Sequence, residues 1–542
     1  MVVVQSQRRR TTWSTSRFIS CLLLIAFVFL FLVFWKLTND PNEWKSAAAL
    51  LSSLDTAEAA PIDVPAPIQI EKEVRNGEED EEKGEEEEDN EEDAESTRAD
   101  NGQTQQPDGP HLPILPLVND TLAAPKAVIA YAWTLATCSD FQSSTEGMID
   151  AALVLRHSVQ RISYPYSKYG YHMYVLVHPK AAQCTKILEQ AGYTVVVKEP
   201  PIDKNQIRGE YLRKFVDREW CCGSKEFIKL YAYDLEGHDV VVHVDIDFAF
   251  YRPMDELYDA LLEPPNSPAQ LAAQQQIVTQ FPDEVKFPER IEAFITRDYQ
   301  QVIPGDNATL FQAGFMVVKR NPEVLEELRQ VVLKGDFVDG WNSTSGWGGL
   351  GYAGKVGAKA MQGLIAYYYD QIRPDVSVEI NGCHYNWMGG DILYRNVPAF
   401  YPRKFADKVG KCRNGRETCQ DCQKTPFSDI QSVHYTNCRK PWNCIGIKWA
   451  KGQAKTEQGI DERNSNYDKC MEIIQQWHLL RAELEDMAMR SPSADASQLA
   501  KQWRSGTYKE EVFRGHCHGN GQSKYIPLSR DVDPGLFTNL YN

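Results

Sequence analysis

Short apolar runs alternate with segments of helical spacing across the middle of the chain. Runs rich in β-branched residues indicate buried strands, and apolar residues three and four apart indicate amphipathic helices. The alternation predicts an α/β fold with a mostly parallel sheet flanked by helices. Strands are predicted at 127–131, 171–177, 193–197, 240–244 and 313–318, and helices at 146–161, 181–190, 224–235, from 322, at 362–369 and at 467–489.

The N-terminal region carries an apolar run of a different kind. Residues 18–35 form an uninterrupted stretch of 18 residues without a charge, which is long enough to span a bilayer. Arginines precede it and acidic residues follow it, so the positive-inside rule predicts a cytosolic tail over 1–17 and a single-pass type II anchor. The alternative is a cleaved signal peptide, but the best cleavage candidate, residues 47–49, lies too far beyond the apolar run.

Charge separates the next segment from the rest of the chain. The formal net charge is −17, yet residues 71–100 alone hold 17 acidic and 4 basic side chains, and from Lys126 onward the balance is only about −3. Residues 36–125 are poor in aromatic residues, which predicts a disordered acidic stem. A globular domain is predicted over 126–450 and a helical C-terminal extension over 451–542. The acidic balance argues against nucleic acid as a partner.

Cysteines and glycosylation sequons point to the secretory pathway. Twelve of the 13 cysteines lie beyond the predicted anchor, with sequons at Asn119, Asn307 and Asn342. An oxidising lumen favours disulfides, and a membrane protein of the Golgi is the expected location. Zinc binding is the alternative for one group of cysteines, which comprises Cys412, Cys419, Cys422, Cys438 and Cys444.

The strand at 240–244 ends on two acidic residues. Asp245 and Asp247 follow the apolar run, and side-chain alternation places them on one face with Ile246 turned to the core. Two neighbouring carboxylates at the end of a buried strand repel each other, and a hard divalent cation relieves this repulsion. Open α/β sheets bind their ligands at this edge. His243 shares the face, but core packing is the expected role for it.

Four segments of the chain resemble glycosyltransferase family 8, the glycogenin-like group. They occur in family order and span about residues 126–450. Ala152 to Ser158 are similar to the stretch after the family's first strand, and Asp245 to Leu257 to its metal-binding segment. Gln312-Ala313-Gly314 is similar to its Asn-Ala-Gly motif, and His434 to Trp442 to its His-x5-Lys-Pro-Trp element.

The resemblance implies a GT-A-like fold and a retaining, hexosyltransferase-like enzyme. It implies that a nucleoside diphosphate sugar, with UDP-sugar favoured, donates to a hydroxyl of a glycan or glycoprotein acceptor. Mn2+ is the favoured cation, with His434 as its third ligand beside the two aspartates. Lys440 is expected to stabilise the leaving diphosphate. Lys229 is a second candidate, although a solvated surface charge is the preferred interpretation for it; Gln312, Ala313 and Gly314 are expected to contact the donor.

Two positions depart from the family pattern. Gln312 stands where the family has Asn, and Met361 stands where an Asp commonly precedes the residue matched here by Gln362. Gln362 is therefore a candidate for sugar positioning. Asp391 is a candidate for the missing acid, with Asp370 as another nearby acid.

Two alternative functions and one further sequence motif need to be considered. A catalytically silent scaffold that binds a sugar nucleotide or glycan is favoured by the two departures. A nucleotidyltransferase is disfavoured, because no glycine-rich phosphate loop follows the first strand. Gly349 to Gly354 spell GxGxxG, but no strand is predicted before them, so a mobile loop near the acceptor is the preferred interpretation.

Overall fold

A computed structural model describes ten segments of the chain. These are residues 111–118, 124–138, 146–219, 223–281, 285–306, 308–395, 405–444, 467–490, 513–517 and 525–528. All of these segments belong to the unit Gly102–Asn542, and no residue of the other unit, Met1–Asn101, is among the described residues. None of the helices in these segments is both long and apolar enough to cross a membrane, and the anchor predicted at 18–35 lies outside the described residues.

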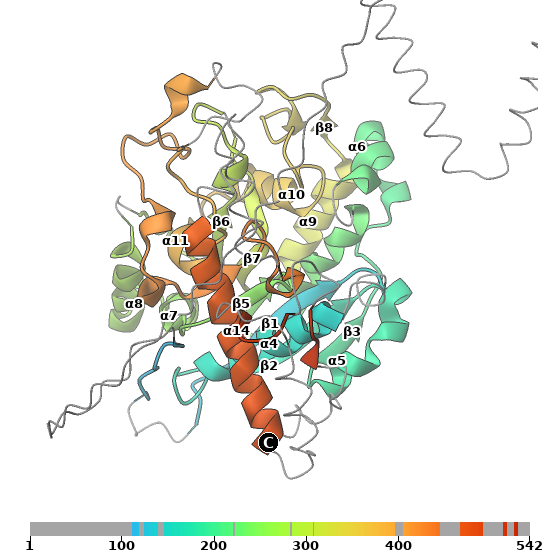
Figure 1. Ribbon diagram of the computed structural model, residues 1–542. Helices are drawn as coiled ribbons and strands as arrows, with labels where there is room; N and C mark the ends of the chain where they lie inside the picture. The colour runs from blue at the N-terminus through green and yellow to red at the C-terminus, as the bar shows by residue number, and fades with distance from the viewer. Residues whose placement is uncertain are drawn as a thin grey trace, which may run out of the picture. The chain divides into compact units, whose positions relative to one another are not determined.

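A seven-stranded sheet in the order β10-β6-β7-β4-β1-β2-β3 forms the centre of the fold (Figure 1). Strand β7 is antiparallel to its two neighbours, β4 and β6, and the other neighbouring strands of this sheet are parallel to one another. The predicted mostly parallel α/β sheet is confirmed. The strands are β1 (Val128–Leu135), β2 (Gly170–Val177), β3 (Thr194–Val197), β4 (Val240–Val244), β6 (Ala293–Arg297), β7 (Phe311–Lys319) and β10 (Ser377–Glu379).

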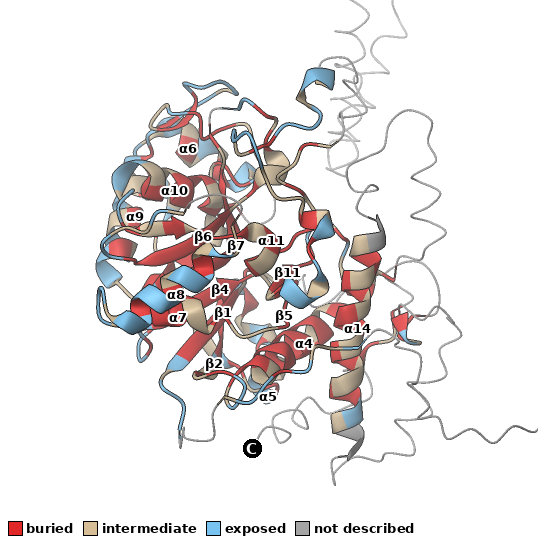
Figure 2. Ribbon diagram, turned by 90° about the vertical axis from the view of Figure 1, so that its left-hand side faces the viewer, coloured by how far each residue is buried: buried red, intermediate tan, exposed pale blue. Residues whose placement is uncertain are grey.

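Helices cover both faces of this sheet. Along β1, Tyr131 packs in one hydrophobic core and Ala132 in the other, as alternation along a strand requires. The first core is closed by α4 (Glu146–Ile162), α7 (Asp255–Leu262), α8 (Pro268–Val278) and α14 (Tyr467–Arg490). The second is closed by α9 (Pro322–Lys334), α10 (Met361–Tyr367) and a 3-10 helix (Gly223–Asp234). Figure 2 shows the central strands buried between these layers.

Several elements differ from the sequence prediction. The segment expected as a helix before β4 is the 3-10 helix Gly223–Asp234, and the helix expected at 181–190 is a 3-10 turn, Pro179–Cys184, followed by α5 (Lys186–Gln190). Further elements were not predicted, among them β6, β10, α7 and α8 of the main layers. The short ones include α6 (Glu210–Phe215), α11 (Gly382–Tyr385), β5 (Phe248–Phe250) paired with β11 (Ser432–His434), and β8 (Phe337–Val338) paired with β9 (Gly346–Trp347).

Residues 111–118 lie in the predicted stem and contact residues of the predicted globular domain. Leu115 is buried, Arg161 on α4 donates to the carbonyl of Pro113 at 2.7 Å, and Val118 N–H donates to the carbonyl of Pro165 at 2.9 Å. These contacts connect the segment to α4 and to the turn that follows it.

Disulfides connect distant parts of the described chain and confirm the preference for cystine over zinc. Of the five cysteines considered for zinc, Cys412 and Cys419 bond to each other, and the other three bond to cysteines outside the group. Adjacent Cys221 and Cys222 lie outside the described residues. The pairs are Cys138–Cys184, Cys383–Cys422, Cys412–Cys419, Cys438–Cys470 and Cys444–Cys517.

Candidate metal centre

Three strands bring the predicted motifs to one edge of the sheet. Asp245 follows β4 directly, and its N–H donates to the carbonyl of Gly314 at 3.1 Å. Because β7 is antiparallel to β4, the start of β7 lies beside the end of β4, with Val244 opposite Phe315. In the small sheet His434 pairs with Phe248, one residue beyond Asp247. Segments nearly 200 residues apart in sequence thus meet at the carboxyl end of β4.

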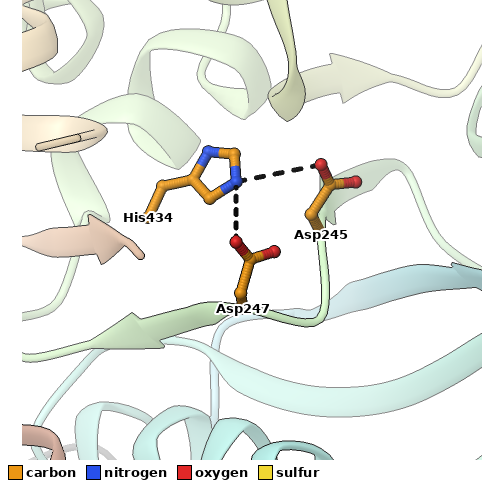
Figure 3. Close-up of side chains that lie close together, drawn as sticks. All are labelled: Asp245, Asp247 and His434. Atoms are coloured by element: carbon orange, nitrogen blue, oxygen red, sulfur yellow. Dashed lines mark ion pairs between the residues drawn. The ribbon is translucent and has the colours of Figure 1, made fainter. Parts of the chain in front are cut away.

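Asp245, Asp247 and His434 point toward one another at this edge (Figure 3). His434 Nε2 lies 3.8 Å from Asp245 Oδ2 and 3.4 Å from Asp247 Oδ2. One ligand atom from each residue lies within 4.8 Å of the other two, close to the ~4 Å that separates opposite ligands of a small divalent cation. Among the described residues this is the group that has metal-ligand geometry.

Two lysines contact the two carboxylates from opposite parts of the chain. Lys229, on the 3-10 helix before β4, places Nζ 2.9 Å from Asp245 Oδ1 and 3.1 Å from Glu226 Oε1. Lys440 forms an ion pair with Asp247. Lys229 is 6% exposed, so the interpretation of Lys229 as a solvated surface charge is wrong. A buried lysine requires carboxylate partners, and here one of them is a candidate metal ligand.

The charges of the site favour ligation by an ionised aspartate and a neutral imidazole. Burial alone raises the pKa of Asp245, but the Lys229 ammonium and His434 outweigh burial and lower this pKa to about 2. Burial lowers the pKa of His434, and the positive charge of Lys229 lowers it further, whereas the negative charge of Asp245 opposes this shift. His434 Nε2 faces two carboxylate oxygens, and a neutral imidazole can offer its lone pair there to a divalent cation that the carboxylates also bind.

Gly314 leaves open the space between these side chains. A Cβ at this position would lie 2.5 Å from His434 Cε1 and 2.7 Å from Asp245 Oδ2, distances at which atoms overlap. Gln312 folds back on its own strand, with Oε1 accepting from Gly314 N–H at 2.9 Å. The predicted donor segment Gln312-Ala313-Gly314 therefore borders the triad, and the glycine is required by space. This cradle and the donor set fit a divalent cation.

Asp298 is a site residue that the sequence prediction missed. It follows β6 directly, and Oδ2 accepts from Gln312 Nε2 at 3.4 Å, Gln362 Nε2 at 3.3 Å and Gln301 Nε2 at 2.7 Å. Burial raises its pKa, although these amides oppose the rise. Its sequence signal is weaker than that of Asp245, because Thr296 and Arg297 separate Asp298 from the short apolar run 293–295, and β6 was not predicted as a strand.

The other predicted residues lie at different distances from this centre. Gln362, near the start of α10, reaches the site through Asp298, whereas Met361 is fully buried in the core. Asp391 accepts from Arg395 Nε at 2.7 Å and from two backbone N–H groups, and these contacts do not connect it to the triad. Asp370 pairs with Arg297 at 2.7 Å. Asp298, by contrast, contacts both Gln312 and Gln362.

Two other interpretations from the sequence are settled by the fold. His243 is fully buried and its Nε2 lies 3.0 Å from Thr134 Oγ1, which confirms its place in the core. The short strand β9 does precede the GxGxxG segment, contrary to the prediction, but the next helix, α10, begins only at Met361. The glycines therefore do not form a strand-turn-helix dinucleotide site.

Comparisons with known proteins give structural likeness only. No protein-family model matches the sequence, and no curated protein matches it significantly. The structure is similar to apo mouse xyloside xylosyltransferase 1, with 9% identity, a TM-score of 0.31 and coverage of 57% of this chain and 98% of that one.

Two further similar structures are also glycosyltransferases. GlyE of Streptococcus pneumoniae has 12% identity and a TM-score of 0.31, and the match covers 68% of this chain and 66% of that one. The galactosyltransferase LgtC, in complex with donor and acceptor sugar analogues, has 12% identity and a TM-score of 0.28, and the match covers 60% of this chain and 93% of that one. TM-scores this low carry no argument about function, which must come from the site itself.

Proposed function

We propose that this protein is a metal-dependent glycosyltransferase that moves a sugar from a nucleoside diphosphate sugar, with UDP-sugar favoured, to an acceptor hydroxyl. The observation that carries the proposal is the convergence of Asp245, Asp247 and His434 within 4.8 Å at the carboxyl end of β4. Lysines that contact both carboxylates supply positive charge beside the place where a diphosphate would lie. The resemblance to glycosyltransferase family 8 further suggests retention of anomeric configuration.

Each residue of the site has a proposed role. Asp245, Asp247 and His434 would hold Mn2+, which when bound supplies positive charge to a diphosphate. Lys440, which pairs with Asp247 and whose side chain is 35% exposed, would turn toward the leaving diphosphate. Lys229 holds the Asp245 carboxylate in place. Gln312, Ala313 and Gly314 form the donor wall, and Gln362 and Asp298 form a polar pair for the transferred sugar.

Binding of UDP in the presence of Mn2+ tests this proposal directly. Titration calorimetry on the full chain in detergent should give Mn2+-dependent UDP affinity that falls at least ~100-fold in Asp245→Ala and in Asp247→Ala, because each removes a ligand. Asp375→Ala, at an exposed aspartate, serves as the matched control and should bind as wild type. If both ligand variants keep wild-type affinity, the proposed site is wrong.

A catalytically silent scaffold remains the second candidate, because Met361 puts a buried apolar side chain where the family has an acid. A panel of UDP- and GDP-sugars with Mn2+ separates the two functions. Release of free nucleotide supports the enzyme, with Asp298 in the acidic position. Tight binding of a sugar nucleotide without release supports the scaffold. Asp391 remains a proposed catalytic residue, which Asp391→Asn would test in the same assay.

Golgi residence and a single-pass type II anchor at 18–35 also belong to the proposal. Support comes from the apolar run with its flanking charges and from five disulfides, which are typical of an oxidising compartment. In sealed microsomes a C-terminal tag should be protected from protease until detergent is added. Digestion of the tag without detergent would contradict this topology.

A further inference from the structure

A separate cavity of about 410 Å³ lies beside the edge strand β10. Its walls come from the ends of β6 and β10, the turn after β6, the start of α11 and the loop that two disulfides hold. Its volume is within the range of small-ligand sites. We propose that this cavity binds a neutral saccharide unit of the acceptor, an inference that rests on the proposed transferase function.

The polar side chains of the cavity are held in place by one another. Arg297 donates to Glu379 at 2.9 Å and to Asp370 at 2.7 Å, and Tyr299 OH donates to the same Glu379 at 2.6 Å. On the far wall, Asp391 pairs with Arg395. These ion pairs rigidify the walls before any ligand binds, which lowers the entropy cost of binding.

Asn386 supplies a buried group without a protein partner. The residue lines the cavity and is 1% exposed. Its Nδ2 donates to Thr296 Oγ1 at 2.8 Å, whereas its Oδ1 has no hydrogen-bond partner among the described residues. A buried carbonyl oxygen without a donor costs free energy. Because this oxygen has almost no accessible surface, Asn386 contributes a fixed part of the cavity wall.

The charge balance of the cavity favours a neutral polyhydroxylated ligand. Its two carboxylates are paired with arginines, and its amides, including Asn381 and Gln420, offer both donors and acceptors. Sugar hydroxyls also donate and accept. Lys286 and Arg416 line the cavity at exposed positions, where an ionic contact contributes at most about 1 kcal/mol.

Two residues that line the cavity are connected through the backbone to the candidate metal centre. Gln300 follows Asp298 by two residues and packs tightly on Gly390, another lining residue. Met388 follows Trp387, whose carbonyl accepts from His434 N–H at 2.9 Å. A saccharide in the cavity would therefore be held by segments that also carry residues of the proposed donor site.

Gly382 offers a way to fill the cavity without disturbing the fold. It lines the cavity, its φ is not positive, and a Cβ there meets no atom within 4 Å. Gly382→Phe should occupy the space, and Gly382→Ala is the matched control at the same position. Binding of lactose, maltose, cellobiose and xylobiose to the full chain is measured by saturation-transfer NMR, and Mn2+–UDP affinity by calorimetry.

We expect at least one of these disaccharides to bind wild type and Gly382→Ala equally and Gly382→Phe at least ~10-fold more weakly. Mn2+–UDP affinity should agree within about twofold in all three proteins, which also shows that Gly382→Phe is folded. Equal disaccharide binding by Gly382→Phe, or no binding of any of the four to wild type, overturns the inference. Loss of Mn2+–UDP binding in wild type would instead overturn the proposed function.

Discussion

Two buried clusters of charged side chains use similar residues but satisfy their carboxylates differently. Between α4 and the C-terminal extension, Asp150 Oδ2 accepts from Arg481 Nε at 3.3 Å, Tyr525 OH at 2.7 Å and Leu528 N–H at 2.7 Å. At the carboxyl end of β4, two carboxylates and a neutral imidazole face one another instead. The Asp150 carboxylate is surrounded by donors of the fold, whereas Asp245 and Asp247 each contact one lysine and also face the imidazole of His434.

The difference shows which cluster holds the fold and which is prepared for a ligand. Asp150 and Arg481 are almost completely buried, and the extension is also tied by disulfides at Cys438 and Cys444, on either side of Lys440. His478 Nε2 lies 3.3 Å from the carbonyl of Pro441 in the same loop. The structural cluster thus supports the loop that carries Lys440, while the triad offers oxygen and nitrogen ligands to a divalent cation.

Loss of Asp150 should have the largest effect on stability. Asp150→Ala leaves the Arg481 guanidinium buried without its carboxylate, so the free energy of unfolding should fall by ~3–5 kcal/mol. Asp247→Asn should change it by less than ~1 kcal/mol, because Lys440 is partly exposed. Guanidinium denaturation followed by circular dichroism measures both. Equal destabilisation by the two variants would remove the distinction between the clusters.

Filling the space at Gly314 should affect the triad alone. Gly314→Ala places a methyl group against His434 and Asp245, so Mn2+ affinity should fall by ~100-fold, as expected when ligands are displaced. Gly382→Ala, where a Cβ meets open space, is the control for a glycine change. Mn2+ titration of both variants by calorimetry decides, and wild-type affinity in Gly314→Ala would show that the cation lies elsewhere.

Mild acid should weaken the structural cluster. His478 and His516 face each other at 2.9 Å, and Glu485 and Arg481 lie beside them. Burial, followed by nearby positive charge, lowers the pKa of both rings far below normal. They stay neutral in the fold, whereas the unfolded chain takes up protons below ~pH 6.5. Stability is therefore present above that pH and is lost as the pH falls.

For this pair the free energy of unfolding should drop by about 2 kcal/mol between pH 6.5 and pH 5.5. Denaturation at both pH values in wild type and in a His478→Gln, His516→Gln double variant measures it. The double variant should lose this share of the pH dependence, and His111→Gln, at an exposed histidine, should keep it. An unchanged pH dependence in the double variant would be the contrary result.

The smallest expected effect comes from the lysine that orients a ligand. Lys229→Met removes the donor at 2.9 Å from Asp245 Oδ1, and loss of such a partner lowers affinity by ~10-fold. Lys126, which pairs with Asp259 and Glu263, offers a matched control in Lys126→Met. Mn2+–UDP calorimetry compares them. Equal affinities in the two variants would mean that Lys229 has no part in the site.

The motif residues could be predicted from sequence because local pattern encodes them. Asp245 and Asp247 follow a β-branched run, and alternation along a strand puts both on one face whatever the surroundings. His434 could be associated with them only through the resemblance to a family. Asp298 was missed, since the strand before it has only three apolar residues in a row and ends on Thr296 and Arg297.

By itself, the sequence determines the alternation of helices and strands, the α/β class and the acids at the end of β4, because hydrophobic periodicity is local. Only the tertiary structure decides that β7 runs antiparallel, that Lys229 is buried on Asp245 and which cysteines pair. These features depend on side chains far apart in the chain, and the positions of those side chains follow from packing both faces of one sheet.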